Sequence, residues 1–397
     1  MSNARLSPPA SRTLMVMAGG TGGHMIPAHA LAAELKSRGH GVLLITDERG
    51  ARFPGIFEDV PVHILPAGRL DGGPIAMLRA LGAVVKGRGQ AKRLYRDHRP
   101  NVVIGFGGYP AFPSLLAAST LNIPTVLHEQ NAVLGRVNRL LAGEAAAIGT
   151  AYDEVDRLKP KYADKAVVVG NPVRAEIARL GELPFPAFDD VAPLKILVTG
   201  GSQGATVLSK VVPEGLGMLA PSLRRRLQVV QQCRPEDIER VRAQYADLGI
   251  PAELMTYIED MADKLADAHL VIGRAGASTV AELTAAGRPA ILIPFAAATD
   301  DHQTANAREM VKAGGARAIQ EASFTPDVLA RQIEALAMDP VALANAAGRA
   351  LSVGRPHAAR DLADLVERIA NGAAPLAVGP VLAPRRRAVA PAGGVPA

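Results

Sequence analysis

Short apolar runs alternate with longer stretches of helical spacing along the whole chain. In the first half the runs are 14–18, 41–45, 102–105, 125–127, 145–148 and 166–169. In the second half they are 195–199, 227–230, 252–257, 270–272, 290–293 and 316–319. Each run has the length of a strand buried on both faces. The alternation therefore predicts an α/β protein in which crossover helices join parallel strands.

A proline-rich stretch separates the two series of runs. Residues 171–194 hold four prolines, which predict a linker. The two series also begin alike, with "LMVMAGGTGGH" and "KILVTGGSQGA". Each is an apolar run, a glycine turn and a helix start, so we expect two similar doubly wound domains. Their expected bounds are 13–172 and 173–355.

The end of the chain divides into a helix and a tail. Leu362, Leu365, Val366 and Ile369 form one apolar stripe, which predicts a helix over 356–371. Residues 373–397 are mostly Pro, Ala, Gly and Val around three arginines. This composition predicts a disordered tail.

Four junctions between a strand and a helix are rich in glycine, at 19–24, 105–109, 200–205 and 273–279. A helix start exposes unpaired backbone N–H groups, and glycine lets an anion approach them closely. One such turn can simply reverse the chain. Four turns at the ends of parallel strands favour a site for a phosphate or diphosphate.

Two common nucleotide motifs do not fit these turns. A dinucleotide site is the main alternative to a phosphate or diphosphate site, because Asp47 follows the second apolar run, where a ribose-binding acid would lie. The first turn nevertheless departs from G-x-G-x-x-G, and neither "GGTGGH" nor "GGSQGA" contains the Gly-Lys-Ser/Thr of a P-loop. Asp300 and Asp301 are adjacent rather than spaced as Asp-x-Asp, and we expect no metal site.

Composition indicates the cellular compartment in which the chain is expected. The chain has 397 residues, 48% of them hydrophobic, and a single cysteine, which cannot form an internal disulfide. A reducing cytoplasm is therefore expected. The apolar run near the start is too short for a signal peptide, and no run reaches the length of a membrane-spanning helix.

The positive charge is concentrated in one segment. Residues 69–99 hold eight Lys or Arg and two Asp, an excess equal to the +6 of the whole chain. An apolar helical stripe precedes the cations, which predicts a face for an anionic membrane surface. The predicted membrane-facing residues are Ile75, Leu78, Leu81, Val85, Lys86, Arg88, Lys92 and Arg93. Alternatively, the stripe packs on the sheet. Nucleic acid is not expected as a partner, because aromatic residues are only 4% and Trp is absent.

Several longer motifs resemble one family. They are "GGTGGH" (19–24), "GFGGYPAFP" (105–113), "LHEQNAVLGRVNR" (127–139), "VGNPVR" (169–174), "GGSQGA" (200–205), "YIEDM" (257–261), "RAGASTVAEL" (274–283) and "DDHQTANA" (300–307). In this order they are similar to the MurG family of bacterial N-acetylglucosaminyltransferases, from about residue 13 to about residue 370. Ile26 and Gly273 depart from the pattern.

The resemblance implies a fold and a reaction. The fold is GT-B, two Rossmann-like domains facing across a cleft, with the last helix packing back on the first domain. The reaction moves N-acetylglucosamine, with inversion, from its UDP donor to the 4-hydroxyl of undecaprenyl-diphosphate-linked muramoyl pentapeptide in peptidoglycan synthesis. The implied place is the cytoplasmic face of the inner membrane. No cofactor is implied, and other cell-wall synthesis proteins are further partners.

The resemblance also implies a site. His24 is the candidate base, because a helix start disfavours the imidazolium and keeps the ring neutral. His128 and His302 remain alternatives. The implied donor contacts are Thr21, Gly22, Gly23, Asn131, Arg174, Ser202, Ile258, Ala277, Ser278, Thr279, Val280, Ala281, Glu282 and Gln303. Thr279-x-x-Glu282 also fits a capping box, in which the Glu282 carboxylate binds the backbone of Thr279 instead of a ribose.

Two other functions remain open. Another UDP-sugar enzyme, either a glycolipid transferase or an epimerase, would share the fold. A regulator that binds a sugar nucleotide without turnover would share the second domain. Dependence of turnover on a lipid-linked acceptor separates the enzymes, whereas the regulator would bind UDP without any turnover.

Overall fold

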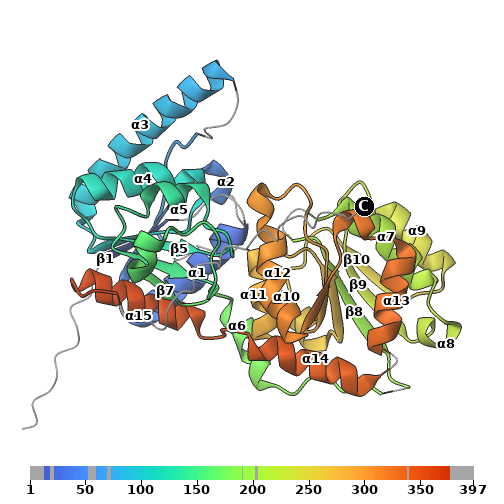
Figure 1. Ribbon diagram of the computed structural model, residues 1–397. Helices are drawn as coiled ribbons and strands as arrows, with labels where there is room; N and C mark the ends of the chain where they lie inside the picture. Colours follow the sequence, from blue (N-terminus) through green and yellow to red (C-terminus); the bar gives the residue numbers. More distant parts are fainter. Residues whose placement is uncertain are drawn as a thin grey trace, which may run out of the picture.

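The computed structural model describes residues 13–17, 22–51, 60–68, 73–189, 191–201, 204–337 and 339–375, with the backbone alone at 13, 15–17, 22 and 74–76. Its strands form two separate sheets in which every pair is parallel, and helices cover both faces of each sheet (Figure 1). The α/β class with two doubly wound sheets is thereby confirmed. The expected tail from residue 376 onward lies outside the described residues.

The first sheet has seven strands in the order β3-β2-β1-β4-β5-β6-β7. The strands are β1 (Thr13–Met17), β2 (Gly41–Thr46), β3 (Val62–Ile64), β4 (Val102–Gly105), β5 (Thr125–Glu129), β6 (Ala147–Thr150) and β7 (Ala166–Val168). The apolar pattern did not predict β3. This strand has three residues at the edge of the sheet, and Val62 and Ile64 are exposed, so it lacks the apolar run of a buried strand.

Helices cover the first sheet on both faces. They are α1 (Gly22–Ser37), α2 (Glu48–Ala51), α3 (Pro74–His98), α4 (Gly108–Thr120) and α5 (Arg136–Leu141), with a 3-10 turn η1 (Pro160–Lys165). Side chains of α1 belong to one core cluster. Those of α3, α4 and α5 belong to the cluster on the opposite face.

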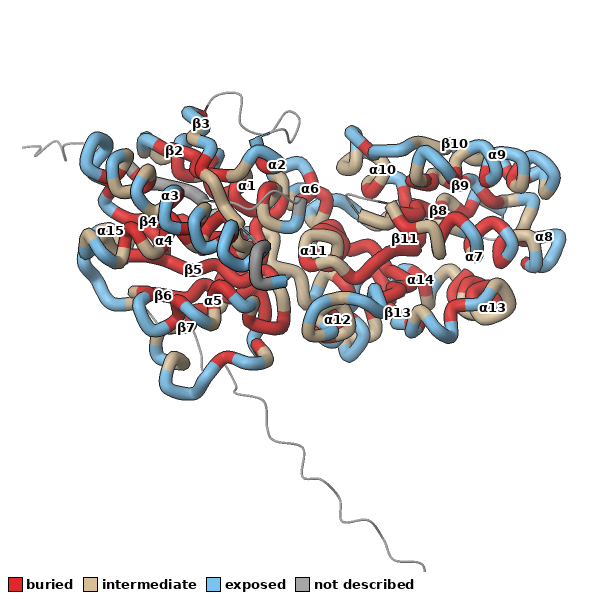
Figure 2. Tube along the Cα trace, turned by 90° about the horizontal axis from the view of Figure 1, so that it is seen from above, coloured by how far each residue is buried: buried red, intermediate tan, exposed pale blue. Residues whose placement is uncertain are grey.

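The second sheet has six strands in the order β10-β9-β8-β11-β12-β13, which repeats the order of the first. The linker forms α6 (Ala175–Ala178) and η2 (Arg179–Glu182). The strands are β8 (Leu194–Thr199), β9 (Leu227–Gln232), β10 (Ala252–Met255), β11 (Leu270–Gly273), β12 (Ala290–Leu292) and β13 (Ala316–Ala318). Figure 2 shows the buried strands of each sheet between helices whose outer sides are exposed.

The second sheet is also covered on both faces. Its helices are α7 (Thr206–Gly217), α8 (Pro221–Arg224), α9 (Ile238–Asp247), α10 (Met261–Asp267), α11 (Ala277–Ala285), α12 (His302–Ala313), α13 (Pro326–Ala337) and α14 (Pro340–Ser352), with 3-10 turns η3 (Thr299–Asp301) and η4 (Glu321–Ser323). Residues of α7, α9 and α13 join one core cluster. Residues of α10, α11 and α12 join the other.

The final helix, α15 (Ala358–Ala370), returns to the first domain and packs against α1 and β4–β6 (Figure 1). Its buried Leu362, Val366 and Ile369 belong to the core cluster of α1. Gly149 on β6 permits this approach, because a methyl group there would lie 3.2 Å from a Leu362 methyl carbon.

Charged side chains fasten the outer side of the same helix. Arg38, just after α1, contacts Asp364 at 2.6 Å and Glu367 at 3.0 Å. His40 Nε2 lies 2.7 Å from the other oxygen of Glu367. The apolar stripe of α15 and these polar contacts on its outer side thus hold the helix on the first domain.

The apolar stripe of α3 faces solvent, so the alternative in which it packs on the sheet is wrong. Leu78, Leu81 and Val85 are 71%, 54% and 65% exposed. The packed side of α3 instead carries Ala80, Val84, Gly87, Ala91 and Tyr95. The side chain of Ile75 lies outside those described. The N-terminal end of α3 projects beyond the body of the first domain (Figure 1).

We expect apolar packing to hold α15 more strongly than its ion pairs. Leu362→Ala empties a fully buried position and should weaken the docking of α15 by about 2–5 kcal/mol. Arg38→Ala removes partly exposed pairs and should weaken it by about 1 kcal/mol. Amide hydrogen exchange of α15 measures its local opening. Equal loss of protection in the two variants would contradict this ranking.

Candidate active site

The carboxyl ends of both sheets face the cleft between the domains. In each sheet the chain order reverses between two neighbouring strands, β1 and β4 in the first, β8 and β11 in the second. Open parallel sheets bind ligands at this reversal. A cavity of about 500 Å³ lies here, lined by the ends of the second-domain strands and by Gly23 and Ile26 of α1.

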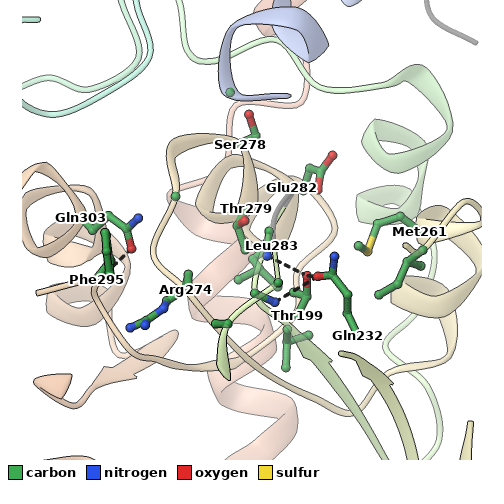
Figure 3. Close-up of a pocket in the computed structure, with 18 of the residues that line it drawn as sticks. Thr199, Gln232, Met261, Arg274, Ser278, Thr279, Glu282, Leu283, Phe295 and Gln303 are labelled. Carbon is green, nitrogen blue, oxygen red and sulfur yellow. Dashed lines mark hydrogen bonds between the residues drawn. The ribbon is translucent and has the colours of Figure 1, made fainter. Parts of the chain in front are cut away.

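The start of α11 forms one wall of the cavity. Gly276 is the N-cap, and Ala277, Ser278 and Thr279 form the first turn, whose N–H groups have no carbonyl partner within the helix. The Ser278 hydroxyl is buried and has no hydrogen-bond partner. Figure 3 shows Ser278 and Glu282 projecting from α11, with Gln303, Phe295 and Arg274 on one side of the cavity. The start of α7 adds a second helix N-terminus through Ala205, Thr206 and Val207. This wall suits an anion.

Arg174 and Glu282 meet at the cavity. Arg174 Nη2 donates to Glu282 Oε1 at 3.3 Å, and the buried Arg174 Nε atom has no hydrogen-bond partner, with Glu176 Oε1 4.0 Å away. Burial raises the pKa of the Glu282 carboxyl, while Arg174 acts in the opposite direction. The capping box is wrong, because α11 begins at Ala277 and Thr279 is therefore its third residue rather than its cap. The Glu282 carboxylate is directed to the cavity instead.

His24 lies on the first-domain side, in the first turn of α1, and packs on a glycine turn. A methyl on Gly107 would lie 3.7 Å from His24 Nε2, and one on Gly108 would lie 3.5 Å from His24 Cε1. Both glycines have positive φ, 81° and 74°. Burial and, secondarily, the nearby His302 lower the pKa of His24 to about 4, and Asp47 opposes that shift. The ring is therefore neutral at pH 7.

The two alternative histidines have different surroundings. His128 is fully buried, and its Nε2 and Nδ1 atoms lie 2.9 Å from Gly170 O and 3.0 Å from Gln130 Nε2. It joins the end of β5 to the linker. His302 starts α12, and its Nδ1 lies 2.8 Å from the carbonyl oxygen of Thr299. Its electrostatic effect on His24 lowers the pKa of that histidine.

The cavity gathers many of the residues that the sequence singled out. Gly23, Arg174, Ile258, Ala277, Ser278, Thr279, Glu282 and Gln303 line it. Val280 and Ala281 instead line a smaller cavity behind α11. Asn131 does not line the large cavity, and its amide is bound to Glu129 and Asn306. Gly22 starts α1, while Thr21 and Ser202 lie outside the described residues.

Sequence reasoning missed several polar residues of the cavity, among them Gln232, Arg274 and Glu321. Gln232 Oε1 accepts from Thr199 Oγ1 at 3.1 Å and from Gly200 N at 3.2 Å, which holds the glycine turn after β8. Arg274 pairs with Glu321 at 2.9 Å and lies over the Phe295 ring. Their position in the sequence could have identified Gln232 and Arg274. A polar residue at the carboxyl end of a buried parallel strand lies at the edge of the sheet where ligands bind.

Within the part of the chain that the structure describes, no group of three His, Cys, Asp or Glu side chains is arranged to bind a metal. In the same residues, no helix has both the length and the apolar character needed to cross a bilayer.

Comparisons with known proteins agree with this geometry. The model of the glycosyltransferase family 28 N-terminal domain matches residues 14–150, and that of its C-terminal domain matches residues 195–366. A UDP-N-acetylglucosamine–N-acetylmuramyl-(pentapeptide) pyrophosphoryl-undecaprenol N-acetylglucosamine transferase of Erythrobacter litoralis is 62% identical, over 90% of each chain. A transferase of the same name from Zymomonas mobilis is 61% identical, over 90% of this chain and 93% of its own.

Solved structures give the same result. The crystal structure of Acinetobacter baumannii MurG superposes with a TM-score of 0.72 at 32% identity, over 90% of this chain and 99% of that one. A UDP-N-acetylglucosamine 2-epimerase of Listeria monocytogenes has a TM-score of 0.65 at 14% identity, over 91% of this chain and 98% of that one, which shows a shared fold alone. The chain therefore belongs to glycosyltransferase family 28 and, within it, to the MurG family of N-acetylglucosaminyltransferases.

Proposed function

We propose that this protein transfers N-acetylglucosamine from its UDP donor to the 4-hydroxyl of undecaprenyl-diphosphate-linked muramoyl pentapeptide. A bond forms between the acceptor oxygen and the anomeric carbon, and the bond from that carbon to the terminal phosphate oxygen breaks. UDP leaves with the bonding electron pair, and the acceptor proton passes to a base. Direct displacement inverts the anomeric centre and gives a β-linked disaccharide on the lipid.

The cavity between the domains carries this proposal. Its volume of about 500 Å³ suits a sugar nucleotide, and both domains line it. The first turn of α11 and the start of α7 offer N–H groups for the diphosphate as negative charge grows on the leaving group. The buried Ser278 hydroxyl, which has no protein partner, is a further donor for a phosphate oxygen.

Arg174 and Glu282 complete the donor site in this account. The 3.3 Å contact between them is long for a charge-assisted hydrogen bond. An entering diphosphate offers Arg174 a stronger partner, and the two ribose hydroxyls then donate to the Glu282 carboxylate. The pair thus gives the buried Glu282 carboxylate and the partly buried Arg174 guanidinium a partner until the donor replaces each of them.

His24 is the base in this proposal. Its ring is neutral because its pKa is lowered to about 4, and its neighbour Gly23 lines the cavity from the first-domain side. His128 is less suited, since both of its ring nitrogens have partners within the protein. The donor's negative diphosphate raises the pKa of His24 in the complex, which makes it a stronger base when it is needed.

The exposed stripe of α3 is the proposed membrane contact, on the cytoplasmic face of the inner membrane. Met77, Leu78, Leu81 and Val85 are each more than half exposed, an unusual state for four apolar side chains on one helix. Lys86 and Arg93 follow on exposed turns of the same helix. A lipid-linked acceptor stays in the bilayer, so the enzyme has to reach it there.

The reaction is tested by the release of UDP from UDP-N-acetylglucosamine with and without a short-chain lipid-linked acceptor, in EDTA. We expect release only with acceptor, and a loss of about 10²- to 10⁴-fold in kcat for His24→Ala, as expected for removing a general base. UDP binding, measured by calorimetry, should be unchanged, and His63→Ala serves as a control. Release without acceptor would contradict the transferase, and full turnover by His24→Ala would contradict the base.

The pH dependence provides an independent test of His24. The base must be neutral, so activity falls as pH decreases through its pKa. In kcat/KM for the donor, which reports the free enzyme, we expect this fall near pH 4, the value that burial and His302 set. In kcat the fall should come at higher pH, because bound diphosphate favours the imidazolium. Coincident falls in both parameters, near the pKa of an exposed histidine, would contradict this account.

The membrane contact is tested with vesicles that contain anionic lipid. Leu78→Asp with Leu81→Asp places two charges on the proposed face, and we expect about tenfold weaker binding. Met218→Asp with Val341→Asp is the matched control, because both are apolar residues of the second domain and are 54% and 66% exposed. Unchanged binding of the double variant, or equal weakening by the control, would exclude α3 as the docking face.

A further inference from the structure

One buried amide joins the two domains. Asn306 lies on α12 of the second domain and has no exposed surface. Its Oδ1 accepts from the backbone N–H of Ala132 at 2.8 Å. Its Nδ2 donates to Asn131 Oδ1 at 3.1 Å and to the Ala275 carbonyl at 3.2 Å. A single side chain thus holds a first-domain loop and a second-domain turn together.

On the first-domain side, the contact continues to a buried carboxylate. Asn131 donates its backbone N–H and its Nδ2 to Glu129 Oε1, at 3.1 and 3.2 Å. The other oxygen, Oε2, accepts from Gly135 N at 2.7 Å and Asn138 Nδ2 at 2.8 Å. Burial raises the pKa of Glu129, and these four N–H groups counteract it. The loop from 129 to 138 is therefore closed around one side chain.

This loop borders the candidate base. A methyl on Gly107 would lie 3.6 Å from Asn138 Nδ2 and 3.7 Å from His24 Nε2, so both side chains meet over the same glycine. Asn138 also donates to the carbonyl of His128 at 3.2 Å, which fixes its amide. Asn138 therefore connects the loop at Asn131 to the packing around the His24 ring.

On the second-domain side, the contact ends at the donor cavity. Ala275 immediately precedes Gly276, the N-cap of α11, whose first turn lines the cavity. Asn306 also lies one turn after Gln303, another lining residue, on α12. Among the other contacts between the domains, Arg308 pairs with Asp156 at 3.0 Å, but Arg308 is 46% exposed, so water and salt weaken that pair.

We propose that Asn306 is a positioning residue for the transfer reaction, one that holds the loop beside His24 in register with the first turn of α11. The inference rests on the proposed function. Its physical basis is burial, because a hydrogen bond inside the protein is directional, and leaving its partners unpaired is unfavourable. Asn306 touches neither the cavity nor the His24 ring and acts through the groups that it binds.

Two variants separate positioning from general stability. Asn306→Ala removes all three bonds, and Asn306→Asp keeps the size and the acceptor but loses both donated bonds. For each we expect kcat to fall about tenfold or more, with the Kd for UDP within about twofold of the unchanged protein. Arg308→Ala, which removes the exposed pair beside it, should keep its kcat.

The contrary outcomes are equally definite. A kcat within twofold in both variants would overturn the inference. So would a loss of UDP binding in step with kcat, since Asn306 would then merely stabilise the second domain. Hydrogen exchange of segments 131–132 and 275–276 needs no turnover, and it should rise in both segments. Unchanged exchange overturns the inference, whereas absent transfer by the unsubstituted protein contradicts only the proposed function.

Discussion

Unpaired N–H groups at helix starts are the constraint on which the rest of this structure depends. Parallel strands place all of their crossover helices with their N-termini at one edge of the sheet, and the N–H groups of a first turn have no carbonyl partner in the helix. Both sheets of this protein turn that edge toward the same cleft. The backbone alone therefore gives the cavity an anion-binding wall, without any charged side chain. Glycine turns keep this backbone accessible.

Among the side chains around this wall that the structure describes, the buried charged groups have partners. Arg174 and Glu282 neutralise each other, Arg274 pairs with Glu321, and the Glu129 carboxylate is surrounded by N–H groups. The domains meet through similar chemistry, because a buried amide beside a small apolar cluster joins the first-domain loop at Asn131 to the turn before α11. Hydrogen bonds of this kind fix the orientation of the two domains as well as the distance between them. A reaction between two separately bound substrates needs both.

The sequence predicted the fold better than the site, for physical reasons. Strands buried on both faces read as apolar runs, so only the short exposed edge strand β3 was missed. The outward face of α3 was ambiguous, because its packed face includes small residues such as Ala80 and Ala91, whereas Leu78, Leu81 and Val85 face solvent. Thr279 and Glu282 matched a local capping pattern, but α11 starts at Ala277. Gln232, Arg274 and Glu321 meet only in the folded chain, where no local spacing connects them.

The most direct test of the central claim, that one cavity between the domains binds the donor opposite His24, is a crystal structure with UDP-N-acetylglucosamine bound. The account predicts the diphosphate at the N–H groups of residues 277–279, with Arg174 moved from Glu282 to a phosphate oxygen. It also predicts that Glu282 accepts from the ribose hydroxyls and that the anomeric carbon faces the first domain. A nucleotide bound elsewhere, or one bound beside an unbroken Arg174–Glu282 pair, would contradict it.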